Sequence, residues 1–153
     1  MSLSLEDIVP MRYALNSDRE VVTLPYSDRE CSDYAASTDS VAKGFLTIAT
    51  MDISNIEVSI EVDHIASSWA HVYSSEDALV LAEPANDWWW FWGNDDYEDA
   101  TNIHMFDISE IGSTSYVGSG RVSGTVQDQF SISEYEGIVR VASTTDALSL
   151  IHI

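Results

Sequence analysis

In the first half of the chain, short apolar runs alternate with turn-forming residues. Residues 45–53 are largely apolar on both alternating faces, which predicts a strand buried on two sides. Residues 56–62 alternate strictly between apolar and polar, which predicts a half-exposed strand near a sheet edge. Residues 69–73 and 78–82 flank a polar turn and predict a hairpin. Together these runs predict one four-stranded antiparallel sheet.

A second set of four β-prone runs follows residue 100. The runs are residues 101–108, 115–117, 126–132 and 138–142. Gly118, Gly120 and Gly124 lie between the second and third runs, so we expect tight turns there. Their spacing lacks the Lys-Ser/Thr end and the following helix of a phosphate-binding loop. The second set therefore predicts another antiparallel sheet.

The two sets resemble each other in sequence. MDIS at 51–54 matches FDIS at 106–109, VYS at 72–74 matches QFS at 129–131, and LVLA at 79–82 matches VRVA at 139–142. A period of about 55 residues predicts a repeated four-stranded sheet, the unit from which propellers are built. A propeller closes its ring, and this chain is too short to do so alone. We therefore expect a piece of a larger repeat protein.

The repeat sets the expected domain organisation. We expect the two blades at residues 44–82 and 101–145, with a tryptophan-rich insertion at 83–100 between them. A tail at 146–153 ends in LSLIHI, which is similar to translated sequencing-adapter read-through. In that case His152 carries no function.

The N-terminal residues 1–43 lack a sustained period and predict an irregular arm. Ser4 and Pro10 bracket one expected helical turn at residues 4–9. The rest of the arm is rich in Ser, Asp and Pro and holds one β-prone run at 21–24. We therefore expect a long loop or an extended arm before the first blade.

Composition narrows the classes of partner. The formal net charge is −20 and Lys43 is the only lysine, so phosphate backbones and anionic membranes are poor partners. Cationic partners, divalent ions or a salty medium fit this negative charge better. We favour the explanation that the acidic residues only keep the protein soluble. Cys31 is the only cysteine, which excludes an internal disulfide or a multi-cysteine zinc site. No apolar run has membrane-spanning length, and no signal-peptide pattern is visible.

The tryptophan-rich insertion is the most unusual local sequence and the first candidate for function. Its candidate binding residues are Trp88, Trp89, Trp90, Trp92 and Tyr97, and its candidate calcium ligands are Asp95, Asp96, Glu98 and Asp99. Exposed tryptophans stack on sugars or fit hydrophobic partners, and carboxylates supply the hard oxygen ligands of calcium. The favoured alternative is that these rings pack on a sheet edge or a neighbouring blade.

Other candidate chemistry is weaker. His64, His71 and His104 have no helical spacing, so we expect ordinary hydrogen-bonded strand histidines rather than metal ligands. No nucleophile motif is present. We also predict that Arg121 or Arg140 is ion-paired, the latter with Glu134 or Glu136.

Five segments carry a family resemblance. They are LEDIVP at 5–10 with Tyr13, Cys31 in its polar setting, GFLTIATMD at 44–52, VYSSEDALVLA at 72–82, and residues 101–144 with TNIHMFDIS and GRVSGTVQDQFSISEYEGIVRVAST. Nearly the whole chain up to Thr145 resembles secreted proteins with a C-terminal β-propeller domain, distantly related to WD40 repeats. The resemblance implies a propeller fold and an extracytoplasmic location, and it brings no catalytic residues.

Two functions remain open from the sequence. The first is a non-enzymatic binding or scaffolding module, secreted or at the cell surface, whose ligand is a protein or a glycan. The second is a fragment of a propeller enzyme, hydrolase or metal-dependent, whose site needs further blades. We favour the first, and calcium is the only cofactor considered. Open sheet faces also predict pairing with the remaining blades or self-association.

Overall fold

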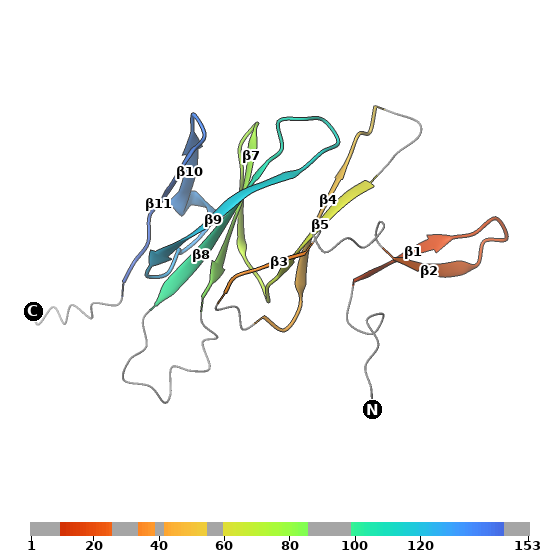
Figure 1. The fold of residues 1–153 in the computed structure, drawn as a ribbon, viewed down its shortest axis with the longest axis horizontal. Coiled ribbons are helices and arrows are strands. Elements are labelled where there is room, and N and C mark those ends of the chain that lie inside the picture. Colours follow the sequence, from red (N-terminus) through yellow and green to blue (C-terminus); the bar gives the residue numbers. More distant parts are fainter. Residues whose placement is uncertain (1–9, 26–33, 39–41, 55–59, 86–98, 146–153) are drawn as a thin grey trace, which may run out of the picture.

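The structure is a computed structural model that describes residues 10–25, 34–38, 42–54, 60–85 and 99–145 (Figure 1). In these ranges the chain is all-β, as predicted, with no α-helix. The described part also holds no helix with the length and apolar character needed to cross a membrane. The predicted helical turn at 4–9, Cys31, residues 86–98 and the tail from 146 lie outside the described residues.

A four-stranded antiparallel sheet forms the middle layer. Its strands are β6 (His71–Ser74), β7 (Ala78–Pro84), β8 (Ala100–Asp107) and β9 (Ser115–Ser123), hydrogen-bonded in that order. The predicted hairpin of residues 69–73 and 78–82 and the predicted strand 101–108 are confirmed. β7 and β8 are the central strands, and their apolar side chains fill both faces of the sheet.

A three-stranded sheet packs on one side of this middle layer. It contains β4 (Phe45–Met51), β5 (Ile60–Ala66) and β3 (Tyr34–Ala36), in the order β3-β5-β4. A strand is confirmed at Phe45–Met51, but the expectation that it is buried on two sides is wrong, because β4 lies at the edge of this sheet and Thr47, Ala49 and Met51 are exposed. Residues 56–59 of the predicted strand at 56–62 lie outside the described residues. β5, which begins at Ile60, is the central strand because β3 adds to it in parallel, so the expected place at a sheet edge is wrong.

Residues 11–25 form a hairpin, so the expectation of an irregular arm is wrong here. β1 (Met11–Leu15) pairs antiparallel with β2 (Val21–Pro25). The side chain of Asn16 accepts hydrogen bonds from the backbone N–H groups of Asp18 and Glu20, both at 2.9 Å. Arg19 takes a left-handed φ of 62°. This local side-chain turn closes the hairpin, which periodicity alone did not indicate.

A C-terminal hairpin forms the third layer. β10 (Ile132–Tyr135) pairs with β11 (Ile138–Val141). The predicted strand at 126–132 is wrong for most of its length, because residues Gln129–Ser131 form a single 3-10 turn, η4. Asp128 causes this turn, since its side chain accepts from the backbone N–H groups of Phe130 and Ser131 at 2.9 and 3.2 Å.

Two hydrophobic cores hold the layers together. Ile65, Leu81 and Phe106 form the core between the three-stranded and the four-stranded sheet. The second core lies between the four-stranded sheet and the C-terminal hairpin, and is formed by Val80, Ala82, Ile103, Val126 and Ile132. The sheets therefore stack face to face along the chain, as successive blades do.

The sheets do not follow the grouping expected from the repeat. Residues 45–82 were expected to form one four-stranded sheet, but β6 and β7 share a sheet with β8 and β9 and not with β4 and β5. The middle sheet thus combines the second half of one sequence repeat with the first half of the next. A repeat period fixes the length of a unit but not the point at which a sheet begins, and this is why the expected grouping fails.

The glycines also depart from the prediction. Gly118 and Gly120 lie inside β9 and not in a turn, opposite Met105 and Ile103 of β8. Of these three glycines of the cluster, only Gly124, just after the strand, has a left-handed φ, of 90°. A side chain at Gly124 would start 2.5 Å from the carbonyl oxygen of Thr144, so the two chain segments approach closely only because glycine is present.

Candidate functional site

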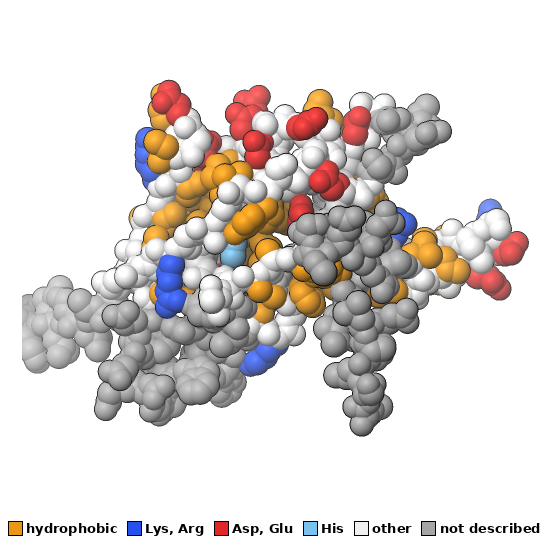
Figure 2. Space-filling view, viewed as in Figure 1, with side chains coloured by type: hydrophobic (Ala, Val, Ile, Leu, Met, Phe, Trp, Pro, Cys, Tyr) orange, Lys and Arg blue, Asp and Glu red, His pale blue; other side chains and the backbone are white. Residues whose placement is uncertain are grey.

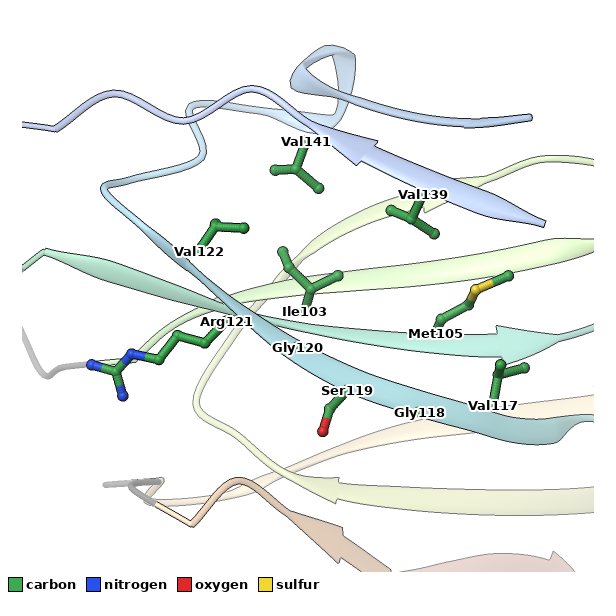
Figure 3. Close-up of a pocket in the computed structure, with 10 residues that line it drawn as sticks. All are labelled: Ile103, Met105, Val117, Gly118, Ser119, Gly120, Arg121, Val122, Val139 and Val141. Atoms are coloured by element: carbon green, nitrogen blue, oxygen red, sulfur yellow. The ribbon is translucent and has the colours of Figure 1, made fainter. Parts of the chain in front are cut away.

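An apolar groove opens between β9 and the C-terminal hairpin. It has a volume of about 370 Å³ and is lined by Ile103, Met105, Val117, Gly118, Ser119, Gly120, Arg121, Val122, Val139 and Val141. We call it the β11 groove. In Figure 3, Val139 and Val141 project from β11 toward Ile103 and Met105 of β8. Apolar side chains from two layers therefore face each other across an open space.

The two glycines of β9 create the floor of the β11 groove. Gly118 and Gly120 have no side chain, and a Cβ atom added to either would meet no atom within 4 Å. Ser119 and Arg121 point to the other side of the strand (Figure 3). Alternation along a strand requires this, because successive side chains face opposite sides of the sheet. The groove is thus bare at Gly118 and Gly120, and Val122 lines it further along β9.

β11 forms one wall of the groove and offers a sheet edge. Among the described residues it pairs only with β10. The N–H of Ala142 donates to the carbonyl oxygen of Ser131 at 2.8 Å. In an antiparallel pair these bonds alternate, so the backbone groups of Val139 and Val141 point away from β10. Those groups are in position to pair with a further strand.

The acidic side chains lie apart from the β11 groove. Figure 2 shows acidic side chains along the upper edge of the molecule, and hydrophobic side chains on the face between the C-terminal hairpin and β9. The turns at that edge carry Glu76, Asp77, Glu110 and Glu136, all exposed. A cationic partner would be attracted to the edge while its apolar part entered the groove.

A buried polar cluster joins the three-stranded sheet to the four-stranded sheet. The hydroxyl of Ser37, just after β3, donates to Glu83 Oε1 at 2.9 Å and lies 3.3 Å from His104 Nε2. His104 Nε2 is also 3.2 Å from Glu83 Oε1. Glu83 and His104 are almost completely buried. The Nε2–H tautomer of His104 satisfies this geometry, because its N–H donates to the carboxylate.

The cluster does not have the geometry of a nucleophilic relay. In such a relay the acid and the hydroxyl bind opposite nitrogens of the imidazole. Here Ser37 and Glu83 both lie at Nε2, and Nδ1 is buried without a partner among the described residues. The arrangement therefore fastens one sheet to the next.

The pKa of Glu83 reflects this environment. Burial raises the pKa of its carboxyl, but hydrogen bonds from His104, Ser67 and Ser37 outweigh burial, so the pKa lies below its ordinary value. The carboxylate therefore stays ionised inside the protein and binds three donors from three segments.

Most of the candidate residues in the tryptophan-rich insertion lie outside the described residues. This holds for Trp88, Trp89, Trp90, Trp92 and Tyr97 and for the calcium candidates Asp95, Asp96 and Glu98. Asp99 is described, and its backbone carbonyl accepts from Gly124 N–H at 2.6 Å. No group of three or more metal-ligating side chains occurs among the described residues.

The prediction of hydrogen-bonded strand histidines is confirmed for His64 and His104, whereas His71 makes an edge contact with the Trp69 ring, 5.0 Å between ring centres. His64 Nδ1 lies 3.0 Å from Thr47 Oγ1, and His104 bonds Glu83. The prediction that Arg140 pairs with Glu134 or Glu136 is wrong. Its guanidinium lies 5.4 Å from the ring centre of Tyr135, and Glu134 instead accepts from Gly137 N–H at 2.7 Å. An exposed guanidinium that lies over an aromatic ring is stabilised by that ring, so it does not need a carboxylate partner.

Sequence reasoning missed the β11 groove. Its signal was present in the alternation of Gly118 and Gly120 with Ser119 and Arg121, which is a strand pattern with one bare face. Because glycine more often indicates a turn, Gly118 and Gly120 were predicted to lie in turns and not in a strand.

The comparisons with known proteins agree with the layered sheets. The family model for the beta propeller domain matches residues 3–150. Neither the curated proteins nor the solved structures gave a match. The match spans almost the whole chain, and the chain therefore belongs to the beta propeller domain family.

Proposed function

We propose that this chain is a non-enzymatic binding or scaffolding module that holds an extended segment of a protein partner in the β11 groove. The observation that carries the proposal is the open apolar groove beside a sheet edge whose backbone groups at Val139 and Val141 point away from β10. An extended segment added to such an edge gains main-chain hydrogen bonds along its length, and its alternate side chains enter the groove.

The lining favours a protein ligand over a glycan. The groove contains no aromatic ring, and aromatic faces are the usual platform for sugars. Valine, isoleucine and methionine side chains with bare glycines suit small or flexible apolar side chains. The resemblance to secreted propeller proteins supports a location outside the cytoplasm, which we propose together with the binding role.

The tryptophan-rich insertion is a proposed second contact for the same partner. It connects β7 to β8, and the backbone N–H of Ala85 bonds the carbonyl oxygen of Ala100 at 2.9 Å where the connection starts and ends. We expect replacement of Trp88, Trp89 and Trp92 by Ala to weaken partner retention and leave the melting temperature unchanged. Loss of folding would instead indicate that these rings pack internally. Asp95, Asp96, Glu98 and Asp99 stay the proposed place for calcium, and a melting temperature unaffected by chelator would rule that out.

The groove is tested with a peptide of alternating threonine and valine flanked by lysines. We expect NMR shifts at Ile103, Met105, Val139 and Val141 when this peptide is titrated into the chain. A Gly/Ser peptide with the same lysines should give none of them, because it matches the charge but lacks apolar side chains. Equal responses to both peptides, or binding of a soluble oligosaccharide in their place, would contradict the proposal.

A pair of variants on β9 localises the binding. Gly120→Phe places a ring in the groove, where a new side chain meets open space, and should abolish peptide binding. Ser123→Phe adds the same ring to the same strand outside the lining of the groove and should leave binding unchanged. Undiminished binding by the Gly120→Phe chain would show that the groove is not the site.

A further inference from the structure

We infer that the segment held in the β11 groove is strand β4 of a second copy of this chain. The inference rests on the proposed function, since it names the partner of that groove. It follows from the internal repeat, because the middle sheet shows how a strand of the β11 type pairs with a strand of the β4 type.

The β4–β5 pair is equivalent to the β8–β9 pair. In the first pair, Ser67 N–H donates to the carbonyl of Gly44 at 3.2 Å, and in the second, Gly124 N–H donates to the carbonyl of Asp99 at 2.6 Å. The strands also end alike. Asp52 Oδ1 accepts from the backbone N–H and hydroxyl of Ser54 at 2.8 and 2.6 Å.

The matching bonds from Ser109 to Asp107 measure 2.9 and 2.6 Å. Hydrogen bonds from the hydroxyl and the backbone N–H of the serine lower the pKa of both aspartates. Strand β4 therefore occupies the position in its repeat that β8 occupies in the next, and Met51 corresponds to Phe106.

The C-terminal hairpin is equivalent to the β6–β7 pair, so residues 72–74 correspond to 132–134, and the predicted match of VYS at 72–74 with QFS at 129–131 is wrong because QFS forms η4. His71 is opposite Ala82, and Ser131 bonds Ala142 in the same relation. Leu79 and Leu81 of β7 face the core shared with the three-stranded sheet, and Val139 and Val141 of β11 face the core shared with the four-stranded sheet. Each hairpin thus turns the same side toward the sheet before it, and Val139 corresponds to Leu79.

The pairing of β7 with β8 supplies the register. Leu79 is opposite Phe106, and Leu81 is opposite His104. Carried over to the equivalent strands, Val139 of one copy lies opposite Met51 of the other, and Val141 lies opposite Ala49. The completed sheet has the order β10-β11-β4-β5-β3, with the last three strands from the second copy.

The hydrogen-bonding edges of the two strands match in this register. β4 is an edge strand among the described residues, and the carbonyl of Gly44 bonds Ser67 on its β5 side. By alternation, the backbone groups of Ala49 and Met51 point away from β5. They meet the outward groups of Val141 and Val139, so the two edges pair without a shift.

The side chains also fit. Phe106 is buried between Leu81 of its own sheet and Ile65 of the preceding sheet. The equivalents of these two neighbours are Val141 and Val122, which line the β11 groove. Met51, the equivalent of Phe106, is 45% exposed in the single chain. Pairing with a second copy buries Met51 in a position equivalent to the buried position of Phe106.

The contact joins two different surfaces, so it is heterologous and repeats head to tail. Each copy then contributes its four-stranded middle sheet and the two parts of a completed five-stranded sheet. The net charge of −20 on each copy opposes assembly, and salt screens it.

The test uses two single-cysteine chains in which Cys31 is replaced by Ser. One carries Met51→Cys and the other Val139→Cys, because neither side chain has a hydrogen-bonding group to lose. Cα atoms of such a pair lie about 5.5 Å apart, within disulfide range. We expect the mixture at about 0.5 M NaCl, where screening is strong, to give a cross-linked heterodimer under mild oxidation. Neither chain alone should cross-link.

Register is checked with Ala49→Cys in place of Met51→Cys. This chain should cross-link to Val141→Cys and not to Val139→Cys, because only the former is its predicted neighbour. Homodimers of a single variant, or no cross-link in a mixture that associates, would overturn the inference. Peptide binding in the groove by chains that stay monomeric and do not cross-link would also overturn it, while the proposed function would stand.

Discussion

The buried carboxylate of Glu83 connects three segments that are far apart in the chain. Its donors come from the ends of β3 and β5 and from the middle of β8. A charged group in this position is stable only because each donor is already held by its own strand. The single side chain therefore controls how two sheets are fastened together.

Acid should weaken this fastening. Because the folded pKa of Glu83 is lowered, its contribution is complete above the ordinary value of 4.5 and is lost as pH falls through the folded pKa. Glu83→Gln should cost about 1–3 kcal/mol of unfolding free energy near neutral pH. That difference should vanish in acid. Urea unfolding across pH measures it, with Glu76→Gln in the exposed β6–β7 turn as control. A difference that stays constant with pH would contradict this role.

Gly124 is the one glycine with no room for a side chain at a left-handed φ. Gly124→Ala should lower the unfolding free energy by about 2–4 kcal/mol, from strain and the clash with Thr144. Gly118→Ala should change it by less than about 0.5 kcal/mol, since nothing lies nearby. Equal effects in urea unfolding would show that the approach of Thr144 is not required.

At the scale of elements, the short turn before β10 is set by one side chain. Asp128 accepts hydrogen bonds from the N–H groups of Phe130 and Ser131. Asp128→Ala should cost about 1 kcal/mol, and Asp128→Asn should retain most of the stability, because its amide oxygen still accepts. Thermal unfolding of both variants decides this, and a fully stable Asp128→Ala chain would contradict it.

Strands were predictable from sequence where the pattern is local. The apolar runs in β4, β7, β8 and β11 are long enough to indicate strands by themselves. The sheet grouping was not predictable, because a period of repeat has no intrinsic starting point. Gly118 and Gly120 in β9 and the turn at Asp128 were missed for a different reason, since glycine and aspartate also favour turns and caps.

The candidate site was predictable only in part. The sequence indicated a binding module with open sheet faces, and it directed attention to the tryptophan-rich insertion. The β11 groove depends on Gly120 and Val141 coming together from different layers. That juxtaposition follows from tertiary packing and has no local pattern.

At the scale of the whole molecule, the negative charge opposes association between copies, whereas the apolar surface favours it. Acidic side chains gather at one edge, while the groove between β9 and the C-terminal hairpin is apolar (Figure 2). Association between copies should therefore strengthen as salt rises from about 0.05 to 0.5 M, because screening reduces repulsion between chains of net charge −20. Binding of the lysine-flanked peptide should weaken over the same range. Sedimentation and titration measure these opposite trends, and parallel trends would contradict the separation.

The central claim is that the edge of β11 takes a further strand. Amide hydrogen exchange at Val139 and Val141 tests it directly, with Arg140 as the internal reference because its N–H faces β10. In dilute chain the amides of Val139 and Val141 should exchange fast and that of Arg140 slowly. At concentrations where copies associate, or with the threonine-valine peptide bound, all three should be protected. Exchange at Val139 and Val141 that stays fast in the associated or peptide-bound state would contradict the account.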